Sequence, residues 1–222
     1  MESKMSELNQ LLLELDYKIN FNEHDFYLSQ SNSNAFNLIN SWPNWDKKIL
    51  NISGEKFSGK SHLANIFKFK SKAFLVNGKN IDNSIFKILK IYESIIIDDF
   101  EECKEEEILY SIFNLIDQDS KYMLINSLTP INQIKFNLSD LSSRSKNCLY
   151  AEIENPDDEL IFAILLKNFS DRQIKVEKKI INFIISRIDR SYRKIDEFIY
   201  KIDELSLKKK KPINFKTIKE IL

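Results

Sequence analysis

Residues 54–61 of this 222-residue chain read Gly-Glu-Lys-Phe-Ser-Gly-Lys-Ser, which fits the pattern G-x-x-x-x-G-K-[ST] of a phosphate-binding loop. The chain has only three glycines, and Gly54 and Gly59 both stand in this stretch. In such a loop, backbone N–H groups wrap phosphate oxygens, the lysine neutralises the outer phosphates and the serine hydroxyl holds Mg²⁺. The predicted contacts to a nucleotide come from Gly54, Phe57, Ser58, Gly59, Lys60, Ser61 and His62.

The residues on either side of the loop support this interpretation. Residues 48–53 are typical of a short buried strand, and residues 61–68 carry apolar side chains at a helical spacing. Strand, loop and helix in this order place the positive end of the helix at the anion. The alternative is a surface turn rich in glycine and serine, and the flanking pattern disfavours it.

A second motif is the apolar run at residues 94–97, which ends in Asp98 and Asp99. A buried strand that ends this way can deliver a carboxylate beside the loop serine. We assign Asp98, together with Ser61, to Mg²⁺, and Asp99 to polarising an attacking water. The alternative is a strand that simply ends in a polar turn.

The rest of the chain falls into two parts. Up to about residue 154, strand-like and helix-like segments alternate, which predicts an α/β fold with a parallel sheet covered by helices on both faces. The expected strands lie at 73–76, 121–125 and 148–153, and the expected helices at 82–92 and 105–119. From Asn155-Pro156 onward we expect only helices, at 157–170, 177–187, 191–207 and 214–221. We therefore predict a leading segment (1–20), a nucleotide-binding base (21–154) and a small helical lid (155–222).

The composition limits the function. Lys and Arg total 33, as do Asp and Glu, so the formal net charge is zero and the overall basic character of a DNA-binding protein is missing. Cys103 and Cys148 have no partner at a metal-ligand spacing, which favours reduced thiols in a cytoplasmic protein. The sequence has neither a run of eighteen apolar residues nor the pattern of a signal peptide, so we expect no membrane association.

Several polar residues are further candidates. Asn126 and Ser127 end a predicted strand, where either can contact the γ-phosphate or simply cap the strand. Arg144 can serve as an arginine finger in a neighbouring nucleotide site, or it is a surface arginine. Arg190 and Arg193 begin the last long helix, where one can fold onto the nucleotide or both can lie on a solvated face.

Residues 10–15 read Gln-Leu-Leu-Leu-Glu-Leu. A short peptide with a glutamine and spaced leucines can insert into a groove of another protein. The alternative is the first turns of an amphipathic helix that packs on the domain.

Taken together, these segments resemble the AAA+ proteins related to the replication initiator DnaA, and more narrowly the Hda-type regulatory inactivators. The resemblance covers almost the whole chain. Besides the loop and the strand with two acids, it rests on residues 10–15, 25–28, 31–32, 42–45, 126–127, 141–144, 154–158, 171–173 and 189–193.

This resemblance implies roles for particular residues. Phe26, Tyr27, Leu28 and Asn32 would border the adenine of ADP or ATP, and Gln10, Leu11, Leu13 and Leu15 would bind the DNA polymerase sliding clamp. Either Asn126 or Ser127 would act as sensor 1, and we assign Asn126 to the catalytic residues. Arg193 would act as sensor 2, and Arg144 as a finger that enters the site of a DnaA-type initiator. Leu128 departs from the pattern, since related proteins often carry an arginine there.

The implied function is regulation of chromosomal replication initiation: with the DNA-loaded clamp, the chain would promote hydrolysis of initiator-bound ATP, with weak activity of its own. DnaA continues into a helix-turn-helix domain, whereas this sequence ends at Leu222, so we expect no sequence-specific DNA binding. Homo-oligomers fit the resemblance. The alternatives are an autonomous ATPase similar to a helicase loader and a non-hydrolysing adaptor that binds the initiator.

Overall fold

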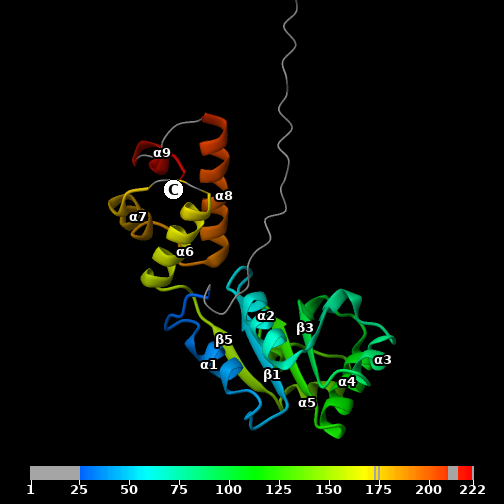
Figure 1. Ribbon diagram of the computed structural model, residues 1–222. Coiled ribbons are helices and arrows are strands. Elements are labelled where there is room, and N and C mark those ends of the chain that lie inside the picture. Colours follow the sequence, from blue (N-terminus) through cyan, green and yellow to red (C-terminus); the bar gives the residue numbers. More distant parts are fainter. Residues whose placement is uncertain (1–25, 173, 175, 210–214, 222) are drawn as a thin grey trace, which may run out of the picture.

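The computed structural model describes residues 26–172, 174, 176–209 and 215–221. Its centre is a five-stranded sheet in the order β2-β3-β4-β1-β5, with every neighbouring pair parallel (Figure 1). The strands are β1 (Ile49–Gly54), β2 (Phe74–Asn77), β3 (Ser94–Asp98), β4 (Tyr122–Ser127) and β5 (Leu149–Ile153). The predicted α/β fold class is confirmed.

Two apolar cores lie on opposite faces of this sheet. Side chains alternate along the central strands, so Leu124 points into one core while its neighbours Met123 and Ile125 point into the other. Helices α1 (Ser33–Ser41) and α2 (Lys60–Ser71) cover the first face. Helices α3 (Ile85–Leu89), α4 (Glu106–Gln118) and α5 (Ser139–Ser145) cover the second. Burial on both faces explains why the central strands read as continuous apolar runs.

Helix α3 is shorter than the predicted helix at 82–92. The Asp82 carboxylate accepts hydrogen bonds from the backbone N–H and the hydroxyl of Ser84, at 2.8 and 2.5 Å. This local turn replaces the first helical turn, because Asp side chains compete with the backbone for the same hydrogen bonds. Short 3₁₀ helices occupy Gly78–Asn80, Phe100–Glu102 and Ile131–Gln133.

The helices after Pro156 pack on one another around a third core, which includes Leu165, Ile184 and Phe198. They are α6 (Asp158–Asp171), α7 (Lys178–Ile185), α8 (Tyr192–Lys209) and α9 (Phe215–Lys219). Asp157 caps α6, since its carboxylate accepts from the Leu160 N–H at 2.7 Å.

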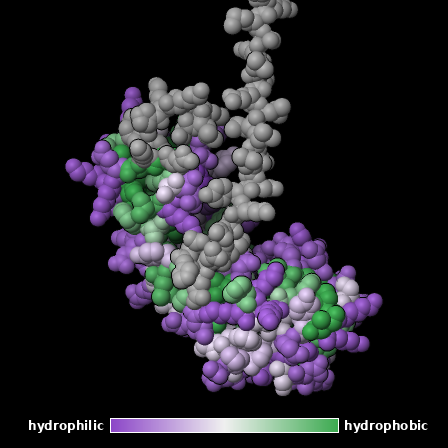
Figure 2. All heavy atoms as spheres, viewed as in Figure 1, coloured by the Kyte–Doolittle hydropathy of each residue, from purple (hydrophilic) through white to green (hydrophobic). Residues whose placement is uncertain are grey.

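These four helices form a group beside the sheet layers (Figure 1), and hydrophobic residues gather on their visible face (Figure 2). Leu160 and Tyr192 are buried in a core of the sheet, so they join the group to it. Within the described ranges, no helix combines the length and apolar character needed to cross a membrane.

Candidate nucleotide-binding site

The phosphate-binding loop lies between the end of β1 at Gly54 and the start of α2 at Lys60. Gly59 precedes α2 with φ +97°, a conformation that side chains rarely adopt, and a Cβ there would lie 3.3 Å from the Phe26 ring. Phe57 is half exposed and has φ +69° despite its side chain. Helix α2 begins at Lys60, so its positive N-terminal end faces the loop.

Lys60 is the cation of this loop. Its Nζ donates to the carbonyls of Gly54 at 2.8 Å and Glu55 at 2.9 Å, and the residue is buried. Burial lowers the pKa of Lys60, while the carboxylates of Glu101 and Asp98 act in the opposite direction. Both hydrogen-bond acceptors are neutral, so an anion in the loop is a natural further partner for this ammonium group.

Three predicted residues meet beside the loop. The Ser61 hydroxyl donates to Oδ2 of Asp98 at 2.9 Å, and Nδ2 of Asn126 donates to Oδ1 of the same carboxylate at 3.0 Å. A carboxylate and a hydroxyl are hard oxygen ligands, so the pair formed by Ser61 and Asp98 fits Mg²⁺. The part of the chain that the structure describes holds no cluster of three Asp, Glu, His or Cys ligands. A magnesium ion here would therefore complete its shell with water and phosphate, as this ion commonly does.

Asn126, and not Ser127, lies against the Asp98 carboxylate. The Ser127 hydroxyl accepts from Nδ2 of Asn51 at 2.9 Å and donates to the Thr129 carbonyl at 2.6 Å. It therefore holds the turn after β4. The buried Oδ1 of Asn126 has no hydrogen-bond partner among the described residues, which leaves it free to order a water or a ligand.

Asp99 is fixed from the end of β2, through contacts that the sequence did not reveal. Its backbone has φ +50°, and its Oδ2 accepts from Nδ2 of Asn77 at 2.8 Å. A Cβ on Gly78 would stand 2.4 Å from the Asp99 carbonyl oxygen, far inside van der Waals contact. The third glycine of the chain thus lets β2 approach Asp99, so all three glycines serve this site.

We expect Gly78→Ala to destabilise the protein by about 3 kcal/mol, because overpacking against a backbone atom forces the main chain to shift. Denaturant unfolding followed by circular dichroism measures the loss. The control is Lys79→Ala at the exposed neighbouring position, which should stay within about 0.5 kcal/mol of wild type. Equal stability of the two variants would mean that the close approach is not needed.

The expected adenine residues lie at the start of the described chain. Phe26 stacks on Phe36 with ring centroids 5.6 Å apart and meets His62 edge-on at 5.3 Å. Tyr27 and Leu28 are about half exposed. The Asn32 side chain is used within the segment itself, since it accepts from Ser29 N and donates to the Tyr27 carbonyl. Asn32 therefore shapes this turn, and Phe26 and His62 stand next to the loop.

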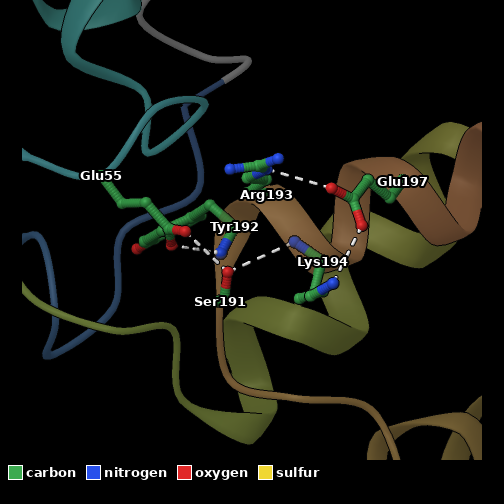
Figure 3. A network of polar contacts seen from close by, with 6 residues as sticks. All are labelled: Glu55, Ser191, Tyr192, Arg193, Lys194 and Glu197. Carbon is green, nitrogen blue, oxygen red and sulfur yellow. Dashed lines mark hydrogen bonds and ion pairs between the residues drawn. The ribbon is translucent and has the colours of Figure 1, made fainter.

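Arg190 and Arg193 both bind acids of the helical group that follows Pro156. Arg193 lies in the first turn of α8, is 69% exposed and pairs with Glu197 at 3.0 Å. Arg190 pairs with Asp158 at 2.7 Å. The loop contacts the start of α8 through Glu55, a residue that the sequence pattern did not indicate (Figure 3). Its only signal in the sequence was an acid directly after Gly54.

Arg144 lies at the other end of the sheet from the loop. In the parallel pairing of β1 with β5, the loop follows Gly54, which is paired with Ile153, whereas Arg144 precedes the first residue of β5. A strand of this length spans about 17–20 Å. Arg144 donates to Asp117 of α4 at 2.6 Å, and its guanidinium group lies 5.8 Å from the Tyr110 ring. The structure therefore separates Arg144 from the other candidates.

The fold is similar to those of several solved structures. Domain III of the Thermotoga maritima replication initiation protein DnaA matches with a TM-score of 0.73 at 17% identity, over 91% of this chain and 95% of that one. AMPPCP-bound DnaA from Aquifex aeolicus matches with a TM-score of 0.63 at 18% identity, over 82% of this chain. The RuvB Holliday junction branch migration motor of Thermotoga maritima matches with a TM-score of 0.66 at 18% identity, over 87% of this chain and 68% of that one.

These likenesses define the class of fold: the chain has the α/β fold of the AAA+ domains of DnaA and RuvB. It spans 64% of the length of the Aquifex protein. No family model matches the sequence.

Proposed function

We propose that this chain is an adenine-nucleotide-binding regulator that promotes hydrolysis of ATP bound to a DnaA-type initiator and so limits replication initiation. The position of Arg144 carries the proposal. A guanidinium group at the far end of the sheet from its own loop has no phosphate of this chain to act on, and a partly exposed planar cation suits a phosphate held by a second protein.

The chain's own site would then hold the nucleotide that supports this action. Lys60 and the loop amides would bind the phosphates of ADP or ATP, and Ser61 with Asp98 would hold Mg²⁺. The resemblance to DnaA domain III, together with the nucleotide analogue named in the Aquifex structure, supports an adenine nucleotide.

The experiment that tests the proposal measures hydrolysis of ATP bound to the initiator, with and without this chain, on DNA that carries loaded clamps. We expect the chain to accelerate hydrolysis only when the clamp is loaded. Equal rates in all mixtures would overturn the proposal.

The clamp contact is proposed for Gln10, Leu11, Leu13 and Leu15, which lie outside the described residues. We expect removal of residues 1–15 to abolish retention of the chain on DNA-loaded clamp, because spaced leucines and a glutamine supply the groove contacts. A pull-down on loaded clamp measures this, and ADP binding, which should be unchanged, is the control. If the truncated chain were retained as well as wild type, residues 10–15 would not be the clamp contact. The alternative would then be an adaptor that binds the initiator without the clamp.

A second candidate function is an autonomous ATPase. The contacts of Asp98 with Ser61 and Asn126 favour it, because such a set can serve hydrolysis as well as binding. Steady-state ATP hydrolysis by the chain alone separates the two functions. Vigorous turnover that requires Lys60 and Asp99 would favour the autonomous enzyme.

A further inference from the structure

Glu55 joins the phosphate-binding loop to the helical group. Its Oε1 accepts a hydrogen bond from the Ser191 hydroxyl at 2.6 Å, and its Oε2 accepts one from the Tyr192 backbone N–H at 2.8 Å (Figure 3). Both donors stand at the start of α8, far away in the sequence. Hydrogen bonds to an ionised carboxylate are the stronger kind, and the positive end of a helix favours a negative charge.

Helix α8 does not need Glu55 in order to begin. The Ser191 hydroxyl already accepts from the Lys194 N–H at 3.3 Å, which is the usual bond of a helix-capping serine. The Glu55 carboxylate adds a contact from another part of the molecule to a helix end that is already capped. The contact therefore links two parts of the fold and does more than stop a helix.

The same residue also contacts the cation of the loop. The Glu55 carbonyl accepts from Nζ of Lys60 at 2.9 Å, so its backbone holds the ammonium group while its side chain holds α8. The start of α8 is also held by packing, since Tyr192 is buried in the same core of the sheet as Leu160 and Ile153. Glu55 thereby connects the loop backbone to the first turn of α8, which carries Arg193.

We propose that Glu55 is a positioning residue through which phosphate binding in the loop and the placement of α8 favour each other. The inference rests on the proposed nucleotide site. The sign follows from the geometry: the two donors of α8 that hold the Glu55 side chain also help to fix its carbonyl, which accepts from Lys60, in the loop conformation that a phosphate would meet.

The first test measures ADP affinity by calorimetry for wild type, Glu55→Ala, Ser191→Ala and the double variant. We expect Glu55→Ala to weaken binding about tenfold, within the usual range of coupling between sites. The double variant should be no weaker than Glu55→Ala, because the two residues act through one contact. Tighter ADP binding by Glu55→Ala would mean that the carboxylate only repels phosphate. If the double variant lost affinity by the product of the two single losses, Glu55 and Ser191 would act independently. Either result overturns the inference.

The control for charge is Glu152→Ala, which removes an exposed carboxylate from β5 and should bind ADP as wild type does. A wild-type protein that fails to bind ADP would defeat the proposed nucleotide site and this inference with it. A wild-type protein that binds, alongside a Glu55→Ala variant that binds equally well, would defeat this inference alone.

The second test uses reciprocity, because any coupling must act equally in both directions. If Glu55 couples the loop to α8 tenfold, saturating ADP should slow amide exchange at Tyr192 about tenfold in wild type and leave it unchanged in Glu55→Ala. A residue that only stabilised the fold would not produce this dependence on ADP. Equal exchange rates with and without ADP in wild type would overturn the inference.

Discussion

The Lys60→Ala variant is expected to bind ADP at least about 100-fold more weakly than wild type. In the proposed site the buried ammonium group would be the positive charge that meets the phosphates, and losing one partner of the charge pair that they would form costs about 3–5 kcal/mol. The effect should be large because the loop amides that remain are neutral donors. Calorimetry with ADP measures the affinity directly.

The matched control for this variant is Lys68→Ala, on an exposed position of the same helix. It removes the same charge and the same length of side chain, but away from the loop. We expect wild-type affinity for the control, and the far-ultraviolet circular dichroism of each variant checks that it is folded. If Lys60→Ala still bound ADP within tenfold of wild type, the loop would not be a phosphate site.

The parallel sheet and the loop between β1 and α2 could be predicted because their signals are local. The apolar run that ends in Asp98 and the stretch from Gly54 to Ser61 each carry their own pattern. The carboxyl ends of β3 and β1, which flank β4 in the parallel sheet, bring the two motifs together. The shortened helix α3 was predicted wrongly, because the competing signal was a single aspartate that forms a turn with Ser84.

The contacts that refine the site depend on residues far apart in the sequence. Asn126 and Ser127 looked equivalent until Asn51, on the neighbouring strand, was seen to hold the serine hydroxyl. Gly78 belongs to no motif, and Glu55 stands at a variable position of the loop motif, for which the pattern specifies no residue. Their importance follows from what stands opposite them, the Asp99 carbonyl and the start of α8, which periodicity and spacing do not encode.

The position of Arg144 also decides how its loss should be measured. The Arg144 side chain is partly exposed and pairs with Asp117, and exposed pairs of this kind contribute about 0–1 kcal/mol to stability. Its removal should therefore leave the fold intact. Because it lies at the opposite end of the sheet from the loop, ADP binding by the chain should also be unaffected.

We expect Arg144→Ala to lose stimulation of initiator ATP hydrolysis by about 10³-fold, the lower end of what an arginine finger contributes. Single-turnover hydrolysis of initiator-bound ATP on clamp-loaded DNA measures it. Arg144→Lys should fail nearly as fully, since an ammonium group lacks the planar fork that spans two phosphate oxygens.

The control for the finger is Lys146→Ala, which removes an exposed cation two residues further along the chain and should stimulate as wild type does. Retention of the Arg144→Ala variant on loaded clamp must match wild type for the loss to be assigned to the finger. Normal stimulation of initiator ATP hydrolysis by Arg144→Ala would mean that another part of the chain is responsible, and Arg144 would not be a finger.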